Sequence, residues 1–194
     1  MPAPTSPRRA LLRRPVTWMV LGLGAIALVV VLLVFEPWKL VVNETVDEAL
    51  PGYSAAPAAG APVSPGIAVG EPPVGPVVLA GGELITHEHA TTGTVQVLAL
   101  PDGSRVLRLE NLDTSNGPDL KVWITDAPVI PGSDGWFVFD DGAYVDLGDL
   151  LGNKGSSNYV LPADVDLSRL TSVSIWCARF DVSFGAAALE PVTP

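Results

Sequence analysis

The sequence has a single cysteine, Cys177, among its 194 residues, so no disulfide can form within the chain. Basic residues are also few and unevenly placed. Four of the 11 Lys and Arg residues lie in the first 35 positions, whereas all 21 Asp and Glu residues follow them. The remainder of the chain is therefore strongly acidic, which disfavours binding to the phosphate backbone of a nucleic acid.

Several catalytic and cofactor motifs are missing as well. The sequence contains no Gly-x-Ser-x-Gly elbow, no Walker loop, no Gly-x-Gly-x-x-Gly turn and no Cys-x-x-Cys-His haem attachment. Nothing in it completes a set of nucleophile, base and oxyanion donors. We therefore do not expect a hydrolase, a nucleotide enzyme or a covalently attached haem, and any enzymatic role would be at most that of a redox component.

One long apolar run is present near the N-terminus. Residues 16–35 contain no charge, and a helix of this length spans about 30 Å, which matches the hydrocarbon core of a bilayer. The Arg-rich residues 1–15 precede it, which predicts a cytoplasmic N-terminus and an extracytoplasmic C-terminal part. A cleaved signal peptide is the alternative, but the run is long and Phe35-Glu36-Pro37-Trp38 offers no small residues for cleavage.

The chain after this run divides by composition. Residues 36–50 are mixed, and residues 51–76 are rich in Pro, Gly and Ala, which is typical of a semi-rigid linker that would hold the following domain away from the lipid. We expect a juxtamembrane segment with this linker over residues 36–80 and a β domain over residues 81–190.

Short alternating segments predict an all-β sandwich or barrel of antiparallel strands in this domain. Pro101-Asp102-Gly103-Ser104 is a strong hairpin signal between two of them. The expected strands cover residues 83–89, 92–100, 105–111, 120–125, 136–139, 143–147, 158–161, 172–177 and 182–189.

Cys177, at the end of an expected strand, is the first candidate for chemistry. A lone thiol outside the cytoplasm would be free, bridged to another chain or a ligand. The competing interpretation is a small buried apolar residue, because free cysteines are among the most buried residue types.

His87 and His89 are the second candidate. A strand would place both imidazoles on one face, which predicts a partial metal site. Adding Cys177 would give a His, His and Cys set that suits copper, but the only methionines are Met1 and Met19, so the domain offers no axial thioether. Two solvated histidines are the alternative.

Residues 111–119 form a loop of Asn, Asp, Ser, Gly and Pro that could offer oxygen atoms or amides to a ligand, with Asn116 and Asp119 as candidates. The alternative is an ordinary turn whose side chains bond their own backbone.

Five pieces in order resemble the DM13 domain, a small extracellular module also called the electron-transfer DM13 domain. They are Gly81-Gly82-Glu83-Leu84; His89 with Gly93; Asn111 and Thr114 to Trp123; Gly152 to Gly155 with Asn158 to Pro162; and, most specifically, Val173 to Leu189 with Trp176-Cys177. Leu112 departs from the aromatic residue expected after Asn111.

The resemblance implies an exported all-β domain in which Cys177 is the proposed redox residue. It would act as a naked thiol or as a ligand to a bound group such as haem, with a metal ion as the other candidate cofactor. His89 matches the family's histidine and would be the opposite ligand, whereas His87 matches nothing obvious.

Two hypotheses follow. The first is a single-pass membrane protein whose outward-facing β domain takes part in cell-envelope redox chemistry through Cys177, with a separate redox protein as its partner. The second is a non-enzymatic binding or adhesion module for a cell-wall component or partner, in which Cys177 is a core residue.

Overall fold

The computed structural model describes residues 15–52 and 75–192. The helix α2 (Pro15–Phe35) is apolar along its length and is the one helix in these residues that is long and apolar enough to cross a membrane. Signal sequences share this length and composition. A short 3-10 helix, η1 (Pro37–Val41), follows it. Residues 1–14 of the expected tail lie outside the described residues, and so do residues 53–74 of the expected linker.

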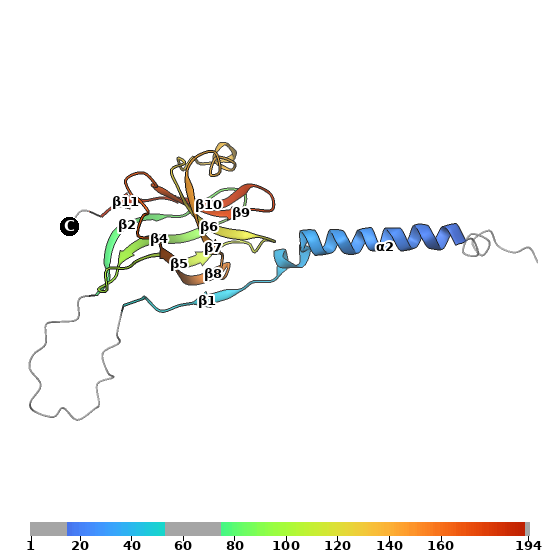
Figure 1. Cartoon of the computed structure of the whole chain (residues 1–194), viewed down its shortest axis with the longest axis horizontal. Helices are drawn as coiled ribbons and strands as arrows, with labels where there is room; N and C mark the ends of the chain where they lie inside the picture. Colours follow the sequence, from blue (N-terminus) through green and yellow to red (C-terminus); the bar gives the residue numbers. More distant parts are fainter. Residues whose placement is uncertain (1–14, 53–74, 193–194) are drawn as a thin grey trace, which may run out of the picture.

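Two sheets stack on each other beyond these helices, which confirms the expected all-β sandwich (Figure 1). The six-stranded sheet has the order β1-β8-β5-β4-β2-β11, and the five-stranded sheet has the order β3-β10-β9-β6-β7. All pairs are antiparallel except β1 with β8. The strands are β1 (Thr45–Asp47), β2 (Val77–Glu83), β3 (Ile85–Thr86), β4 (Thr92–Ala99), β5 (Arg105–Asp113), β6 (Leu120–Thr125), β7 (Tyr144–Asp149), β8 (Lys154–Leu161), β9 (Ser172–Cys177), β10 (Val182–Ala188) and β11 (Glu190–Pro191).

The main core lies between the sheets and is built from one face of each strand. Leu107 and Leu109 of β5 and Val173, Ile175 and Cys177 of β9 all belong to it and are almost fully buried. Alternate residues point to opposite faces of a strand, so Trp176 lies on the other side of the five-stranded sheet. There it packs in a second cluster with Phe139 beneath residues 126–143.

Most expected strands are confirmed, and the hairpin at residues 101–104 joins β4 to β5 with Gly103 at φ 84°. Two expectations are wrong. Residues 136–139 form turns rather than a strand, because they belong to the loop that covers Trp176. The strand expected over residues 83–89 is divided: β2 ends at Glu83 and β3 ends at Thr86.

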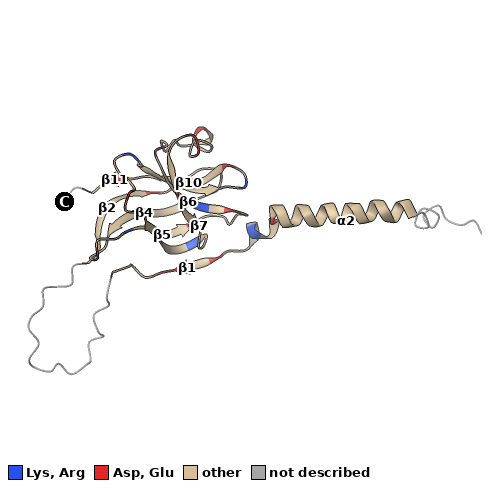
Figure 2. Ribbon diagram, in the orientation of Figure 1, with Lys and Arg blue, Asp and Glu red and all other residues tan. Residues whose placement is uncertain are grey.

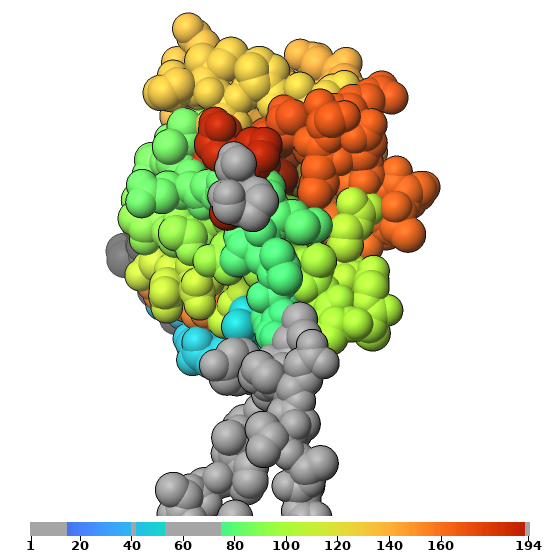
Figure 3. All heavy atoms as spheres, turned by 90° about the vertical axis from the view of Figure 1, so that its left-hand side faces the viewer, coloured from blue at the N-terminus to red at the C-terminus, as the bar shows by residue number. Residues whose placement is uncertain are grey.

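The expected tether contributes two strands, β1 and β2, to the six-stranded sheet. Strand β1 follows closely after η1 and pairs with β8, so the domain lies beside the end of α2 (Figure 1). Figure 3 looks at the opposite end of the molecule, where β2 and β11 lie side by side. One end of the sandwich is therefore close to α2 and the other is remote from it.

Basic side chains occur on η1, β6 and β8 near the end facing α2, and acidic groups pair with them (Figure 2). Lys39 pairs with Glu36 at 2.8 Å, and Lys121 pairs with Asp119 at 3.3 Å and also with Asp149. These lysines therefore leave little unpaired positive charge to attract an anionic partner.

Candidate functional site

Cys177 is the last residue of β9. It is opposite Leu120 of β6 and Val182 of β10, and its side chain is fully buried in the core between the sheets. This burial agrees with the interpretation of Cys177 as a small apolar residue of the core. Backbone N–H groups of the connection to β10 and of Asp119 lie next to its thiol.

Burial raises the pKa of the Cys177 thiol, because a thiolate loses its hydration in the core. The backbone N–H groups of Arg179, Phe180 and Asp119 act in the opposite direction and lower that pKa. The net effect keeps the thiol protonated at neutral pH, and a protonated thiol is a poor nucleophile and a poor metal ligand. In this conformation the Cys177 thiol is therefore unreactive.

Residues 178–181 form the turn that covers Cys177. The Phe180 N–H donates to the Cys177 carbonyl at 3.2 Å, the Ala178 N–H donates to the Asp119 carbonyl at 2.9 Å, and Asp181 has a left-handed φ of 50°. The Phe180 ring is 48% exposed and stacks on Phe35, the last residue of α2, with centroids 5.9 Å apart. The turn above the thiol thus contacts the end of the apolar helix.

Asn153 holds the segment after α2 against the domain, and sequence reasoning missed this role. It is 1% exposed, its Oδ1 accepts from the Glu44 N–H at 2.7 Å, and its Nδ2 donates to the Asn43 Oδ1 at 2.9 Å and the Thr114 carbonyl at 2.6 Å. Asn116 adds a bond from its Nδ2 to the Val42 carbonyl at 3.2 Å. The only signal in the sequence was the run Gly152 to Gly155, without any indication of its partner.

Gly155 explains why β1 can approach β8 so closely. Its φ is 97°, and a Cβ added there would lie 2.2 Å from the Val46 carbonyl oxygen of β1. Any side chain would therefore push β1 out of the sheet.

His87 and His89 lie in a bend beyond β3 and not in one strand, so the expectation that a strand presents both on one face is wrong. His87 is buried, and its Nδ1 is 2.9 Å from the Ser183 Oγ. Burial lowers the pKa of His87, although the Ile130 carbonyl raises it in part. His89 instead packs its ring on Phe184, with centroids 3.9 Å apart. Ser183 and Phe184 are neighbours in β10 and point to opposite faces, so the two imidazoles are separated.

A pocket of about 460 Å³ lies beside His89. Its wall is mainly aromatic and includes Trp136, Phe137, Phe180 and Phe184, together with Glu88 and His89, whose carboxylate and Nε2 are in contact. Val182, the register partner of Cys177, also lines this pocket, whereas Cys177 itself does not. Sequence reasoning identified His89 but missed the aromatic residues around it.

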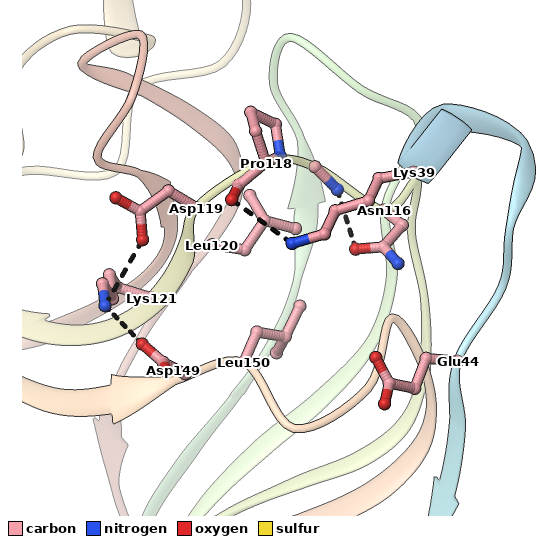
Figure 4. A pocket seen from close by; sticks show the side chains of 10 residues that line it. Lys39, Glu44, Asn116, Pro118, Asp119, Leu120, Lys121, Asp149 and Leu150 are labelled. Carbon is pink, nitrogen blue, oxygen red and sulfur yellow. Dashed lines mark hydrogen bonds and ion pairs between the residues drawn. The ribbon is translucent and has the colours of Figure 1, made fainter. Parts of the chain in front are cut away.

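Asn116 and Asp119 line a second, polar pocket of about 260 Å³ (Figure 4). Lys39 reaches across it to the Pro118 carbonyl at 3.4 Å, and the Asn116 Oδ1 accepts from the Gly117 N–H at 2.8 Å. Asp119 pairs with Lys121. These groups already have partners, so the loop here serves to bind the segment after α2, and a ligand role for Asn116 and Asp119 stays a prediction.

The positions of these side chains show whether a metal ion or a haem group would fit. Within residues 15–52 and 75–192, no three His, Cys, Asp or Glu side chains lie close enough together to hold a metal ion. Haem ligation by Cys177 and His89 together does not fit this conformation either, because the pocket beside His89 does not reach the buried thiol.

The geometry defines an acidic two-sheet β domain held by its own N-terminal segment at the end of an apolar helix, with one buried thiol beneath the turn that contacts that helix. The family model described as "Electron transfer DM13" matches residues 83–189, more than half of the chain. The chain belongs to the DM13 family. No curated protein and no solved structure gives a significant match to it.

Proposed function

We propose that this protein is an electron-transfer component of the cell envelope, anchored by α2 with its DM13 domain on the extracytoplasmic side, and that Cys177 is its redox residue. The family supports a redox role, and the apolar helix supports the anchor. The observation that carries the proposal is the place of Cys177, the only sulfur atom of the domain, directly beneath the turn that contacts the end of α2.

The burial of Cys177 favours a naked thiol that is exposed only when its turn opens. Once exposed and deprotonated, the thiolate would attack a disulfide of a partner protein, forming a mixed disulfide while the second partner sulfur leaves as a thiolate. A second thiol from a partner would then release Cys177 and restore its reduced form. Because the chain has a single cysteine, the other sulfur atoms must come from partners.

The position of the turn also suggests where such a partner would lie. Phe180 contacts Phe35, so a protein that reaches Cys177 through this turn must approach beside the end of α2. With α2 in the bilayer, the partner would itself be a membrane protein or lie flat on the membrane.

The test uses the full chain, with Cys177→Ala and Cys177→Ser as separate variants. Alanine tests the loss of sulfur, and serine tests whether a buried hydroxyl is tolerated. We expect the wild type to form one mixed disulfide per chain with an oxidised disulfide partner, detected by mass spectrometry, and both variants to form none. The same samples are titrated with hemin, and a Soret band that disappears in both variants would favour a ligand role over a naked thiol.

Membrane orientation is tested separately from redox chemistry. Ser104→Cys lies in the exposed β4–β5 hairpin, and Ser6→Cys lies in the Arg-rich tail. With Cys177→Ala in the background, an impermeant maleimide should label the first variant in intact cells and the second only after the membrane is opened. The reverse labelling pattern would refute the proposed orientation.

The full burial and raised pKa of Cys177 favour a second candidate function, a tethered binding or adhesion module in which this residue only packs the core. A Cys177→Ala protein that folds and retains its partner binding and cellular phenotype would establish this second function and overturn the first.

A further inference from the structure

Phe180 presents a large apolar ring at the surface of the turn between β9 and β10. This turn lies at the end of the sandwich that faces α2 (Figure 1). Among the described residues, the ring contact of Phe180 is with Phe35, the last residue of α2, and not with another ring of the β domain. The surroundings of Phe180 are therefore linked to those of the helix end.

The rings of Phe35 and Phe180 lie side by side and are covered to the same extent. Their planes differ by 23°, and the two residues are 47% and 48% exposed, so stacking leaves about half of each uncovered. The headgroup region on each side of a bilayer is about 5–7 Å thick, and the ring centroids are 5.9 Å apart. A bilayer that surrounds Phe35 must therefore reach Phe180 as well.

The charges that follow α2 define the depth of Phe35 once the helix spans a bilayer. The helix has 21 residues and no charged side chain, and its length of about 30 Å matches the hydrocarbon core. Glu36 and Lys39 follow at once and pair with each other at 2.8 Å, so they mark the side of the boundary that faces water. Trp38, between them, is 45% exposed, and tryptophan is common in the headgroup region. Phe35 thus lies at the outer border of the hydrocarbon.

We propose that the β9–β10 turn is a lipid-binding surface, with the free part of the Phe180 ring inserted between phospholipid headgroups beside Phe35. Removing this apolar ring surface from water stabilises the contact. The proposal rests on the proposed membrane anchor, and it does not depend on the chemistry of Cys177.

The charge of the domain favours a zwitterionic phospholipid as the partner. Seven of the 11 basic residues and all 21 acidic residues follow residue 35, so an anionic membrane surface would repel the domain. Within the turn, Arg179 and Asp181 are both exposed and have opposite charges, so the turn itself contributes no net charge. The contact must therefore come from the ring and not from electrostatic attraction.

Spin-labelled lipid tests this contact in the full chain. The protein is placed in phosphatidylcholine bicelles that contain 5-doxyl phosphatidylcholine, whose nitroxide lies just below the headgroups, and the broadening of each backbone amide signal is measured by NMR. We expect strong broadening at residues 178–181 and little at residues 101–104. The latter hairpin is at the other end of the domain, because β8 pairs with β1 at Lys154 and with the start of β5 at Leu161.

Phe180→Asp tests whether the ring makes the contact. A carboxylate is costly to insert into a bilayer, so the turn should withdraw, and the broadening at Ala178 and Arg179 should fall about two-fold or more. Tyr144→Asp is the matched control: Tyr144 is 44% exposed and also stacks on one ring, that of Trp123, but it pairs with Thr125 at the end of β6 opposite the turn. It should leave the broadening of the turn unchanged. Unchanged amide shifts around Ile175, inside β9, show that both variants remain folded.

Two results would overturn the proposal. One is broadening of the turn that is no stronger than that of residues 101–104, and the other is the same broadening of the turn in Phe180→Asp as in the wild type. Failure of the anchor is distinct, because the amides of α2, such as that of Leu28, would then escape broadening as well, and the lipid contact would fail with it. Failure of the redox proposal changes none of these signals and is seen only in the mixed-disulfide assay.

Discussion

Asn153→Ala should release β1 from the edge of the six-stranded sheet. The amide of Asn153 makes three hydrogen bonds at a buried position, two of them to the segment that follows α2. Alanine removes all three and leaves the Glu44 N–H and the Thr114 carbonyl without this partner. Each such bond contributes about 0.5–1.5 kcal/mol net, so the loss of the two bonds to this segment should lower the free energy that holds β1 in place by about 1–3 kcal/mol.

Hydrogen exchange measures this loss directly in the full chain. The Glu48 N–H donates to the Ser156 carbonyl at 2.8 Å, so it exchanges only when this part of the segment leaves β8. A loss of about 1–3 kcal/mol predicts exchange about 5-fold to 150-fold faster at Glu48. Amides around Ile175, in the other sheet, should be unchanged.

Asn43→Ala is the matched control, because it removes only the bond between the Asn43 Oδ1 and Asn153. It should accelerate exchange at Glu48 only about five-fold, as expected for roughly 1 kcal/mol. If Asn153→Ala and Asn43→Ala gave the same rate at Glu48, or if neither differed from the wild type, the view that Asn153 is the main attachment point would be refuted.

Three further changes test other parts of the structure. Burial holds the pKa of His87 below its ordinary 6.5, so as the pH falls the unfolded chain takes up this proton before the folded one does. The free energy of unfolding should therefore fall as the pH drops below about 6.5. His87→Gln should make the free energy of unfolding, measured with urea, depend less on pH in this range. Gly155→Ala should detach β1, because it adds a clash with Val46 to the strain of a left-handed residue, which in isolation costs about 1–3 kcal/mol. Phe180→Ala removes the stack on Phe35 and should raise the rate of Cys177 modification by a soluble disulfide about two-fold to ten-fold.

Each of these changes has its own control. An unchanged pH slope in His87→Gln would mean that other groups cause the acid sensitivity. Gly103→Ala is matched to Gly155→Ala, since Gly103 also has a positive φ but nothing within 4 Å of an added Cβ; equal losses in the two variants would contradict the clash. Tyr144→Ala removes a different aromatic stack, on Trp123, and should not change the thiol rate.

Strand positions were predictable where a segment buries one face, because alternation then records the burial directly. Val95 and Val97 of β4 are examples. The positions of β1 and β2 were not predictable from the sequence. Strand β1 has three residues, only one of them partly buried, and its attachment depends on Asn153, more than a hundred positions away. A local pattern contains no information about such a partner.

In the candidate site, too, some residues could be predicted from the sequence and others depend on contacts between distant segments. Cys177 and His89 could be identified from the sequence because of their residue types and the family motif. The aromatic pocket could not, because Trp136 and Phe137 come from a loop whose apolar residues look like a strand, while Phe180 and Phe184 come from the region of β10. Only the fold shows that the loop covering Trp176 also borders the pocket beside His89.

The segment after α2 does more than connect the helix to the domain, because it also fixes how the domain is oriented relative to the helix. A flexible tether would let the domain turn freely, and any part of its surface could then lie beside α2. Here Asn153, Asn116 and the β1–β8 pairing fix the segment after α2 on the domain, and Phe35 contacts the turn above Cys177. The same end of the domain is therefore held beside the end of α2. A movement of α2 would act first on Phe180, and through the hydrogen bond from its N–H to the Cys177 carbonyl it would act next on the residue that carries the thiol.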